Sequence, residues 1–285
     1  IPLVLVNGRM SDRSFQRWTK MRSFARYLFA RFDLCLAQTQ ADAERLVRLG
    51  APRVTVTGNL KFDSVPPPAS PVMVAGVQDL IGGRPVWLAA STHPGEETLI
   101  IEAHRALITR YPDLLTIIAP RHPERGREIS ALIARAGLRA SQRSLGLQPD
   151  GATDIYVADT IGEMGLFYRT APIVFLGGSL IPHGGQNPIE PAKLGAALLH
   201  GPYVHNFEEV YAALDQAEGA LEISDADTLI RCLDGLFQDP EEADALAKRG
   251  EVALTAIGGA LDRTMAEIAR SRARSEEHTS ELQSR

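Results

Sequence analysis

The sequence predicts an α/β protein with parallel sheets, and three observations support this. Short apolar runs alternate with longer segments of helical period along most of the 285 residues, a pattern typical of parallel strands joined by crossover helices. The apolar runs are rich in Val, Ile and Leu, as expected for strands covered on both faces. Three consecutive prolines, Pro66 to Pro68, interrupt the alternation and favour an extended linker.

The expected elements follow from these patterns. The predicted strands are residues 3–6, 34–37, 54–57, 86–90, 115–119, 155–158, 173–176 and 197–199. The predicted helices include residues 41–49, 96–110, 124–136, 207–214 and 228–237. After residue 226 the pattern is all-helical and ends with a helix over 259–273. These periodicities define an α/β chain with a helical end.

The linker divides the chain into two expected domains. Residues 1–65 form the end of an amino-terminal domain, because the chain opens on strand-like residues without Met and we expect sequence upstream. Residues 66–270 form a second domain with carboxyl-terminal helices. Residues 275–285 have neither helical nor strand periodicity, so we expect the tail 271–285 to be non-native or disordered.

Composition excludes several classes of protein. A formal net charge of −5 argues against a general nucleic-acid binder. Cys35 and Cys232 are far apart and indicate structural thiols in a reducing compartment. No run approaches the roughly 18 apolar residues of a membrane span. The sequence lacks Walker A, Gly-x-Gly-x-x-Gly, Asp-x-Asp, Gly-x-Ser-x-Gly and zinc-spaced His/Cys motifs, which disfavours ATPases, dehydrogenases, metalloenzymes and serine hydrolases. We expect neither a metal nor a cofactor.

Two polar loops directly follow predicted strands. Ser91, Thr92 and His93 follow the strand at 86–90, and Arg121 and His122 follow the strand at 115–119. Carboxyl ends of parallel strands meet at one edge, where open α/β folds bind ligands. Free N–H groups, a hydroxyl and a fixed cation there suit a phosphate or carboxylate. The alternatives are a well-capped strand–helix turn and a solvent-exposed arginine.

Two further loops end at the same expected edge. In the first, Thr160 and Glu163 have the spacing of a capping box, so that loop is either a helix start or part of the site. The second carries four glycines within nine residues, 177–185, followed by Asn187 at an expected N-cap and Glu190 in the first turn. Glu190 either closes that cap or accepts hydrogen bonds from a vicinal diol.

The first domain carries candidate contacts for an anionic substrate and for a membrane surface. Arg9 and Ser11 precede a segment, residues 13–32, that holds six basic and no acidic residues, interleaved with aromatic ones. A basic aromatic helix in an acidic protein indicates contact with anionic lipid. The alternative is a helix packed on its own sheet with a solvated basic face. Lys61 stands beside the linker, where two-domain enzymes commonly place substrates, or is a plain surface lysine.

Six motifs occur in the order seen in a known family. They are NGRMS (7–11), GNLKFD (58–63), STHPGEE (91–97), PRHPER (120–125), DTIGEM (159–164) and GGQNPIEPA (184–192). In these the chain resembles the 3-deoxy-D-manno-octulosonic acid (Kdo) transferases over about residues 1–270. Gln186 departs from the pattern, since the family more usually has His there.

The resemblance implies a GT-B glycosyltransferase with two Rossmann-like domains, the first only partly present here. It implies inverting, metal-independent transfer of Kdo from CMP-Kdo to a phosphorylated lipid A precursor, in lipopolysaccharide synthesis at the cytoplasmic face of the bacterial inner membrane. The runner-up is another GT-B nucleotide-sugar transferase or epimerase. From a different class, a non-catalytic nucleotide-binding or membrane-associated module remains open.

The resemblance also assigns residues. Glu190 would hold the ribose, Arg121 and the glycine-rich backbone the CMP phosphate and Kdo carboxylate, and Glu163 and Met164 the cytidine side. The general base is expected upstream of residue 1, so this chain would bind CMP with impaired turnover. The donor-binding residues implied are Ser91, Thr92, His93, Arg121, His122, Gly162, Glu163, Met164, Gly178, Ser179, Gly185, Asn187 and Glu190. The acceptor-binding residues implied are Arg9, Ser11 and Lys61.

Overall fold

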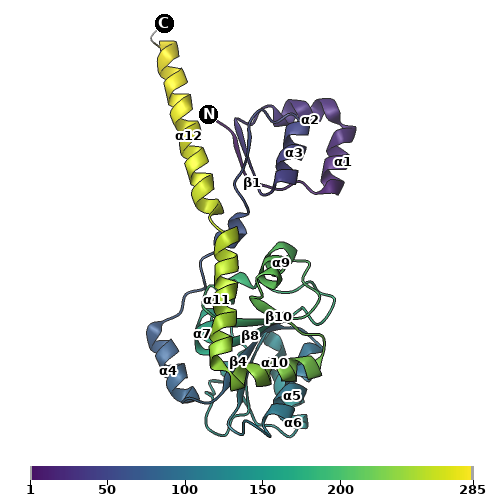
Figure 1. Cartoon of the computed structure of the whole chain (residues 1–285), viewed down its shortest axis with the longest axis vertical. Coiled ribbons are helices and arrows are strands. Elements are labelled where there is room, and N and C mark those ends of the chain that lie inside the picture. The colour runs from purple at the N-terminus through teal and green to yellow at the C-terminus, as the bar shows by residue number, and fades with distance from the viewer. Residues whose placement is uncertain (1, 284–285) are drawn as a thin grey trace. The chain divides into compact units, whose positions relative to one another are not determined.

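The computed structural model describes residues 2–283, which form two compact units (Figure 1). One unit contains residues 1–64 together with 255–285, and the other contains residues 65–254. The sequence pattern predicts that residues 255–270 belong to the second domain, and this is wrong. Their helix joins the first unit because the Asp63 carboxylate accepts hydrogen bonds from the N–H groups of Gly259 and Leu261, each at 2.6 Å. Arg263 also donates to the Thr57 carbonyl at 2.9 Å.

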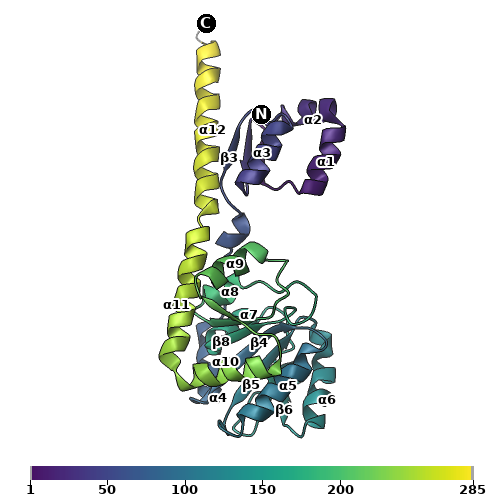
Figure 2. The ribbon, with the colours of Figure 1, turned by 45° about the vertical axis from the view of Figure 1, so that its right-hand side comes forward.

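The first unit is a small parallel sheet covered by helices. Its strands β1 (Val4–Gly8), β2 (Leu34–Ala37) and β3 (Val54–Val56) pair in the order β1-β2-β3. Helices α1 (Asp12–Lys20), α2 (Arg22–Phe29) and α3 (Gln40–Arg48) lie beside the strands (Figure 2). Phe29, Cys35 and Leu46 bring α2, β2 and α3 into one apolar core. A 3-10 helix (Leu60–Asp63) ends this segment, and α12 (Ala260–Gln283) completes the unit.

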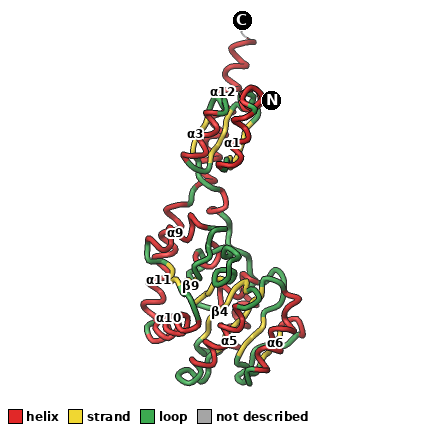
Figure 3. Tube along the Cα trace, turned by 90° about the vertical axis from the view of Figure 1, so that its right-hand side faces the viewer, coloured by secondary structure: helices red, strands yellow, loops and turns green. Residues whose placement is uncertain are grey.

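The second unit is built on a seven-stranded, wholly parallel sheet (Figure 3). The strands are β4 (Val86–Thr92), β5 (Leu115–Pro120), β6 (Ala140–Gln142), β7 (Ile155–Val157), β8 (Ile173–Leu176), β9 (Ala197–His200) and β10 (Ala220–Glu222). They pair in the order β10-β9-β8-β4-β5-β7-β6. After β4 the chain moves outward on one side, through β5, and it later returns to the other side of β4 as β8. This strand order makes the carboxyl ends of β4 and β8 a topological switch point.

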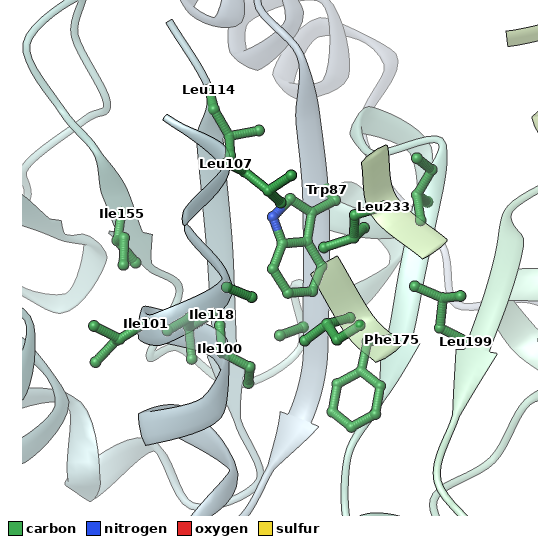
Figure 4. Close-up of a cluster of buried hydrophobic side chains, with 14 of the residues drawn as sticks. Trp87, Ile100, Ile101, Leu107, Leu114, Ile118, Ile155, Phe175, Leu199 and Leu233 are labelled. Atoms are coloured by element: carbon green, nitrogen blue, oxygen red, sulfur yellow. The ribbon is translucent and has the colours of Figure 1, made fainter. Parts of the chain in front are cut away.

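Helices and an apolar core cover the second sheet. The helices are α4 (Pro71–Ile81), α5 (Glu96–Leu107), α6 (Gly126–Arg135), α7 (Met164–Thr170), α8 (Ile189–Ala192), α9 (Glu208–Gln216), α10 (Ala226–Gln238) and α11 (Pro240–Ile257). Trp87 and Phe175 lie in the sheet, with Ile100 and Leu107 from α5 and Leu233 from α10 packed in the same buried cluster (Figure 4). Burial of a side chain of this kind stabilises the fold by about 1.5–3 kcal/mol.

Most predicted elements are present, and the differences are informative. All eight predicted strands are found, whereas β6 and β10 escaped prediction because their residues, Ala-Ser-Gln and Ala-Leu-Glu, do not form a continuous apolar run. The helix predicted over 124–136 is a short 3-10 turn (Pro123–Arg125) followed by α6. The tail 271–285 was expected to be non-native or disordered, whereas in the structure α12 continues through Gln283, and its Glu, Leu, Ala and Arg residues favour helix. Residues 284 and 285 lie outside the described part. None of the described helices is both long and apolar enough to traverse a bilayer.

Candidate functional site

Three of the predicted loops meet at the carboxyl edge of the second sheet, at the switch point. The Arg121 N–H donates to the Thr92 carbonyl at 3.0 Å, which joins the loops after β4 and β5. The His93 ring lies 4.0 Å from the His183 ring and 6.1 Å from the His122 ring, measured between centroids. The loops after β4, β5 and β8 therefore form one site.

The strand ends approach closely because the backbone adopts unusual conformations. Ser91 has a φ of 55°, a left-handed value that a non-glycine residue adopts only at some cost. A Cβ atom added to Gly177 would lie 2.5 Å from the Ser91 carbonyl oxygen. Gly177 is thus required for β4 and β8 to bring their loops together.

The Glu96 carboxylate connects the loops that follow β4 and β8. Its side chain is fully buried at the start of α5 and accepts four main-chain hydrogen bonds. The donors are the N–H groups of His93 (2.9 Å), Gly178 (2.8 Å), Ser179 (3.1 Å) and Leu180 (3.1 Å). Burial raises the pKa of Glu96, and the four amide hydrogen bonds oppose that shift. The carboxylate fixes the glycine-rich loop against α5.

Glu97, the next residue, makes a second buried connection. It accepts a hydrogen bond from the Thr92 hydroxyl at 2.9 Å and pairs with both terminal nitrogens of Arg125, at 2.6 and 3.2 Å. Only 1% of the Glu97 side chain is exposed. A bidentate buried pair of this kind fixes geometry strongly, so Glu97 holds the loop after β5 in place.

These contacts change the role expected of Ser179 and Gly178. The resemblance implied that both residues bind the donor. Instead, Ser179 is fully buried, and its hydroxyl donates to the Leu176 carbonyl at 2.5 Å and accepts from the Gly201 N–H at 2.7 Å. Both amides, those of Gly178 and Ser179, already bind Glu96. Satisfied buried groups have little capacity for a ligand, so Ser179 orients the loop.

The positive charge at the site comes from side chains. Arg121 is exposed, and among the side chains that the structure describes its guanidinium has neither a hydrogen-bond acceptor nor an ion-pair partner. His93 is 6% exposed. Burial, and then the charges of His183, His122, Arg121 and Arg125, lower the pKa of His93 to about 4. The Gln186 side-chain amide lies 3.1 Å from His93 Nε2.

The Asn187–Glu190 turn follows the glycine-rich loop nearly as expected. The Asn187 side chain accepts from the Ile189 N–H at 3.0 Å and donates to Glu190 at 3.1 Å. Helix α8 begins at Ile189, so Pro188 rather than Asn187 is the N-cap. Gly185 donates its N–H to the Gly178 carbonyl at 2.8 Å, which ties this turn to the histidines. Glu190 is half-buried.

The loop at 159–164 is held by a residue that the sequence analysis missed. Arg143 pairs with both carboxylate oxygens of Glu163, at 2.6 and 2.5 Å, and lowers the pKa of Glu163. Thr160 donates its hydroxyl to the same carboxylate. Gly162 is exposed and Met164 begins α7. The Glu163 carboxylate is thus occupied by the protein, and its 20-residue separation from Arg143 left no local sequence signal.

The acceptor candidates lie in the first unit. Arg9 is exposed just after β1, whereas Ser11 caps α1 by accepting from the Ser14 N–H at 3.3 Å. Lys61 is exposed in the 3-10 helix. Two carboxylates of this unit stand near the acceptor candidates in sequence, and both are engaged. Asp12 pairs with Arg45 at 2.6 Å, and Asp63 caps α12.

The ionisable groups of the site are mainly cationic or imidazole. The described residues contain no group of three or more His, Cys, Asp or Glu side chains arranged to hold a metal ion. His93, His122 and His183 instead lie among arginines, with His93 at the centre. Guanidinium and imidazole groups in such proximity favour an anionic ligand.

Comparison with known proteins first defines the class. Two parallel α/β units of this type make a GT-B fold, and the chain matches HepE of Anabaena, solved with UDP and glucose, with a TM-score of 0.54 over 96% of this chain and 72% of that one. At 14% identity this likeness concerns the fold alone.

More similar proteins define the family. A family model described as 3-deoxy-D-manno-octulosonic-acid transferase matches residues 1–64. The solved C-terminal CMP-Kdo binding domain of WaaA from Acinetobacter baumannii is 30% identical, with a TM-score of 0.61, covering 64% of this chain and 98% of that domain. The Kdo transferases of Haemophilus influenzae and Bordetella pertussis are each 35% identical over 93% of this chain and 63% of their own length. The chain belongs to the Kdo transferase family and spans about 63% of the length of these relatives.

Proposed function

We propose that this chain acts within a Kdo transferase that moves Kdo from CMP-Kdo to a phosphorylated lipid A precursor in lipopolysaccharide synthesis. The convergence of three strand-ending loops on a cationic group at the switch point carries this proposal. Further support comes from the family membership and from the likeness of the second unit to a solved domain described as binding CMP-Kdo.

The donor's anionic groups suit the cations of the site. Arg121 has a free guanidinium, which can make charge-assisted hydrogen bonds with a phosphate or with the Kdo carboxylate. Glu190 suits the ribose hydroxyls, because a carboxylate accepts hydrogen bonds from a vicinal diol. Gly162 and Met164 lie beside the fixed Glu163 and suit the cytidine side.

Transfer requires an attacking hydroxyl, a base and stabilisation of the departing CMP. Arg121 and the imidazoles would stabilise negative charge on the leaving phosphate, without a metal and with inversion at the sugar carbon. We propose that Arg9, Ser11 and Lys61 position the acceptor phosphates. Since Asp12 and Asp63 are engaged within the first unit, we assign the general base to neither of them.

The helices α1 and α2 suit an anionic membrane surface, at the cytoplasmic face of the inner membrane. Residues 13–32 include six basic residues and no acidic residue. Met21, Phe24 and Tyr27 are 53%, 55% and 61% exposed along this segment. Exposed apolar side chains among cations are typical of helices that lie on anionic bilayers. If this segment contacted only solvent, the apolar side chains of Met21, Phe24 and Tyr27 would stay in water, whereas a bilayer surface would bury them.

Substitution tests the donor site. Arg121→Ala removes a charge-assisted contact, and we expect roughly 10- to 100-fold weaker CMP binding by calorimetry. Glu190→Ala should weaken CMP binding while leaving the affinity for free phosphate unchanged. Arg105→Ala, an exposed arginine on α5, is the control. CMP affinities in Arg121→Ala and Glu190→Ala equal to the parent's would contradict the donor assignment.

A vesicle experiment tests the membrane surface. Arg17, Arg22 and Arg26 changed together to Gln should weaken binding to vesicles rich in anionic lipid by roughly 100-fold, since each cation contributes about 1 kcal/mol near such a surface. CMP binding should stay intact. The matched control changes Arg105, Arg135 and Lys248, which are exposed elsewhere. Vesicle affinity that is unchanged in the α1–α2 variant would reject this surface.

A further inference from the structure

Three imidazoles and two guanidiniums gather at the site with few free carboxylates among them. His93 is buried at the centre, while His122 and His183 are exposed on either side of it. The charged and titratable groups that surround His93 come from α5, the loop after β5 and the loop after β8. They are Glu96, Glu97, Arg121, His122, Arg125 and His183.

The two buried carboxylates of this set cannot neutralise an imidazolium. Glu96 accepts four amide hydrogen bonds, and Glu97 is paired with Arg125 and Thr92. The exposed Glu124 is 3.7 Å from His122 Nδ1, on the outer side of the group. Like charges disfavour protonation at such short range. Without a ligand, His93 is therefore neutral at physiological pH, consistent with its pKa of about 4.

An anion placed among these groups reverses that balance. A negative charge within about 4–6 Å of an imidazole favours its charged form. Gln186 suits both states of His93, because its amide nitrogen donates to a neutral Nε2 and its amide oxygen, after rotation, accepts from a protonated one. The distance of 3.1 Å between Gln186 Nε2 and His93 Nε2 corresponds to the neutral state.

We propose that binding of an anionic ligand at this site is coupled to uptake of a proton by the buried His93 imidazole, which lies between the loops that carry His122, His183 and Gln186. The inference rests on the proposed donor site and adds a regulation to it. Because the proton is bound more tightly with the anion present, the affinity for the anion rises as pH falls and decreases as pH rises.

Calorimetry in buffers of different ionisation enthalpy measures the coupling directly. CMP is titrated into the whole chain at three pH values, about 6.5, 7.5 and 8.5, which run upward from the ordinary pKa of an imidazole. We expect a net uptake of up to about one proton per CMP at the lowest pH and a Kd that increases by up to about tenfold per pH unit. The phosphate of CMP itself titrates near pH ~6, and its loss of a proton on binding would have the opposite sign.

Two variants locate the proton. His93→Gln removes the ring that takes up the proton, so it should lose most of the proton uptake and of the pH dependence, and circular dichroism checks that this variant is folded. Arg121→Ala should bind CMP more weakly. It should take up at least as much proton on binding, because the Arg121 charge no longer opposes protonation of His93. Side-chain nitrogen NMR spectra of histidine-labelled chain should show a ring that becomes doubly protonated when CMP is added.

The outcomes distinguish a failure of the coupling from a failure of the donor site. If CMP binds and the proton number is zero in every buffer, with the imidazole signals unchanged, the coupling is refuted while the donor site stands. If a folded His93→Gln variant retains the full uptake, His93 is likewise not its source. If CMP does not bind at all, the donor site fails and the coupling fails with it.

Discussion

Glu96 and Glu97 are adjacent in sequence and both buried, yet they stabilise different parts of the site. Glu96 binds main-chain amides of two loops that are separated by more than 80 residues. Glu97 pairs with Arg125, which follows β5. A pair of buried carboxylates is tolerated only when each is fully hydrogen-bonded. The two side chains thereby fix the loops before any ligand is present.

Removing the Glu96 carboxylate should loosen that arrangement. Glu96→Ala leaves four buried amides without an acceptor, and we expect a loss of about 3 kcal/mol of unfolding free energy. For a unit of this size that lowers the Tm by roughly 6–12 °C. Thermal unfolding followed by circular dichroism measures the change. Glu102→Ala, exposed on the same helix, is the control, and a Glu96→Ala protein as stable as this control would disprove the role.

Ser179→Ala distinguishes a positioning role from ligand contact. The substitution removes two internal hydrogen bonds, so the unfolding free energy should decrease by about 1–2 kcal/mol. The CMP affinity should change less than about twofold at a temperature where the variant is folded. An affinity loss of about tenfold or more, without loss of stability, would show that Ser179 touches the ligand.

Sequence reasoning located the right loops but not every role within them. The strand ends identified His93, Arg121 and the glycine-rich turn, because a parallel sheet brings successive strand ends to one edge. The sequence could not show that the Glu96 carboxylate accepts hydrogen bonds from the amides of Gly178 and Ser179, or that Arg143 pairs with Glu163. Those partners are 82, 83 and 20 residues apart and carry no local pattern.

At the scale of elements, α12 belongs to the first unit through contacts at its first turn. Asp63 accepts two N–H groups at the start of the helix, and Arg263 bonds to the Thr57 carbonyl. A carboxylate at a helix N-terminus satisfies orphan amides and interacts favourably with the helix dipole. Gly58, next to Thr57, has a φ of 90°, a left-handed value that favours glycine.

Asp63→Ala should release this connection. We expect a loss of about 1–2 kcal/mol in the stability of the first turn. Amide hydrogen exchange of residues 259–263 should become roughly 5- to 30-fold faster as a result. Asp262→Ala, an exposed acidic residue in the same turn, should have a smaller effect. Equal exchange rates in the parent and in Asp63→Ala would rule out the connection.

The elements themselves were predictable where their patterns were long. Apolar runs identified the central strands β4, β5 and β8 because both faces of each are buried. Periodicity failed for the edge strands β6 and β10, whose three residues are set by pairing with a neighbour rather than by their own composition. Periodicity did predict the helix that is α12, but its place in the first unit was missed, because that place is set by Asp63, 196 positions before Gly259.

At the scale of the whole molecule, charge is distributed unevenly. The chain carries a net charge of −5, yet residues 13–32 of the first unit and the switch point of the second unit are cationic. An overall negative protein with local cationic sites favours selective over general binding of anions. This distribution suits the anionic donor and acceptor that we propose.

The measurement that tests the donor site most directly is calorimetric titration of the chain with CMP, compared with CDP, UMP and UDP under the same conditions. If the switch point is a CMP-sugar donor site, CMP should bind at least about tenfold more tightly than either uridine nucleotide, and Arg121→Ala should abolish most of that affinity. Equal or tighter binding of UDP would instead favour another nucleotide-sugar enzyme of the same fold. Absence of binding by all four would contradict the donor site itself.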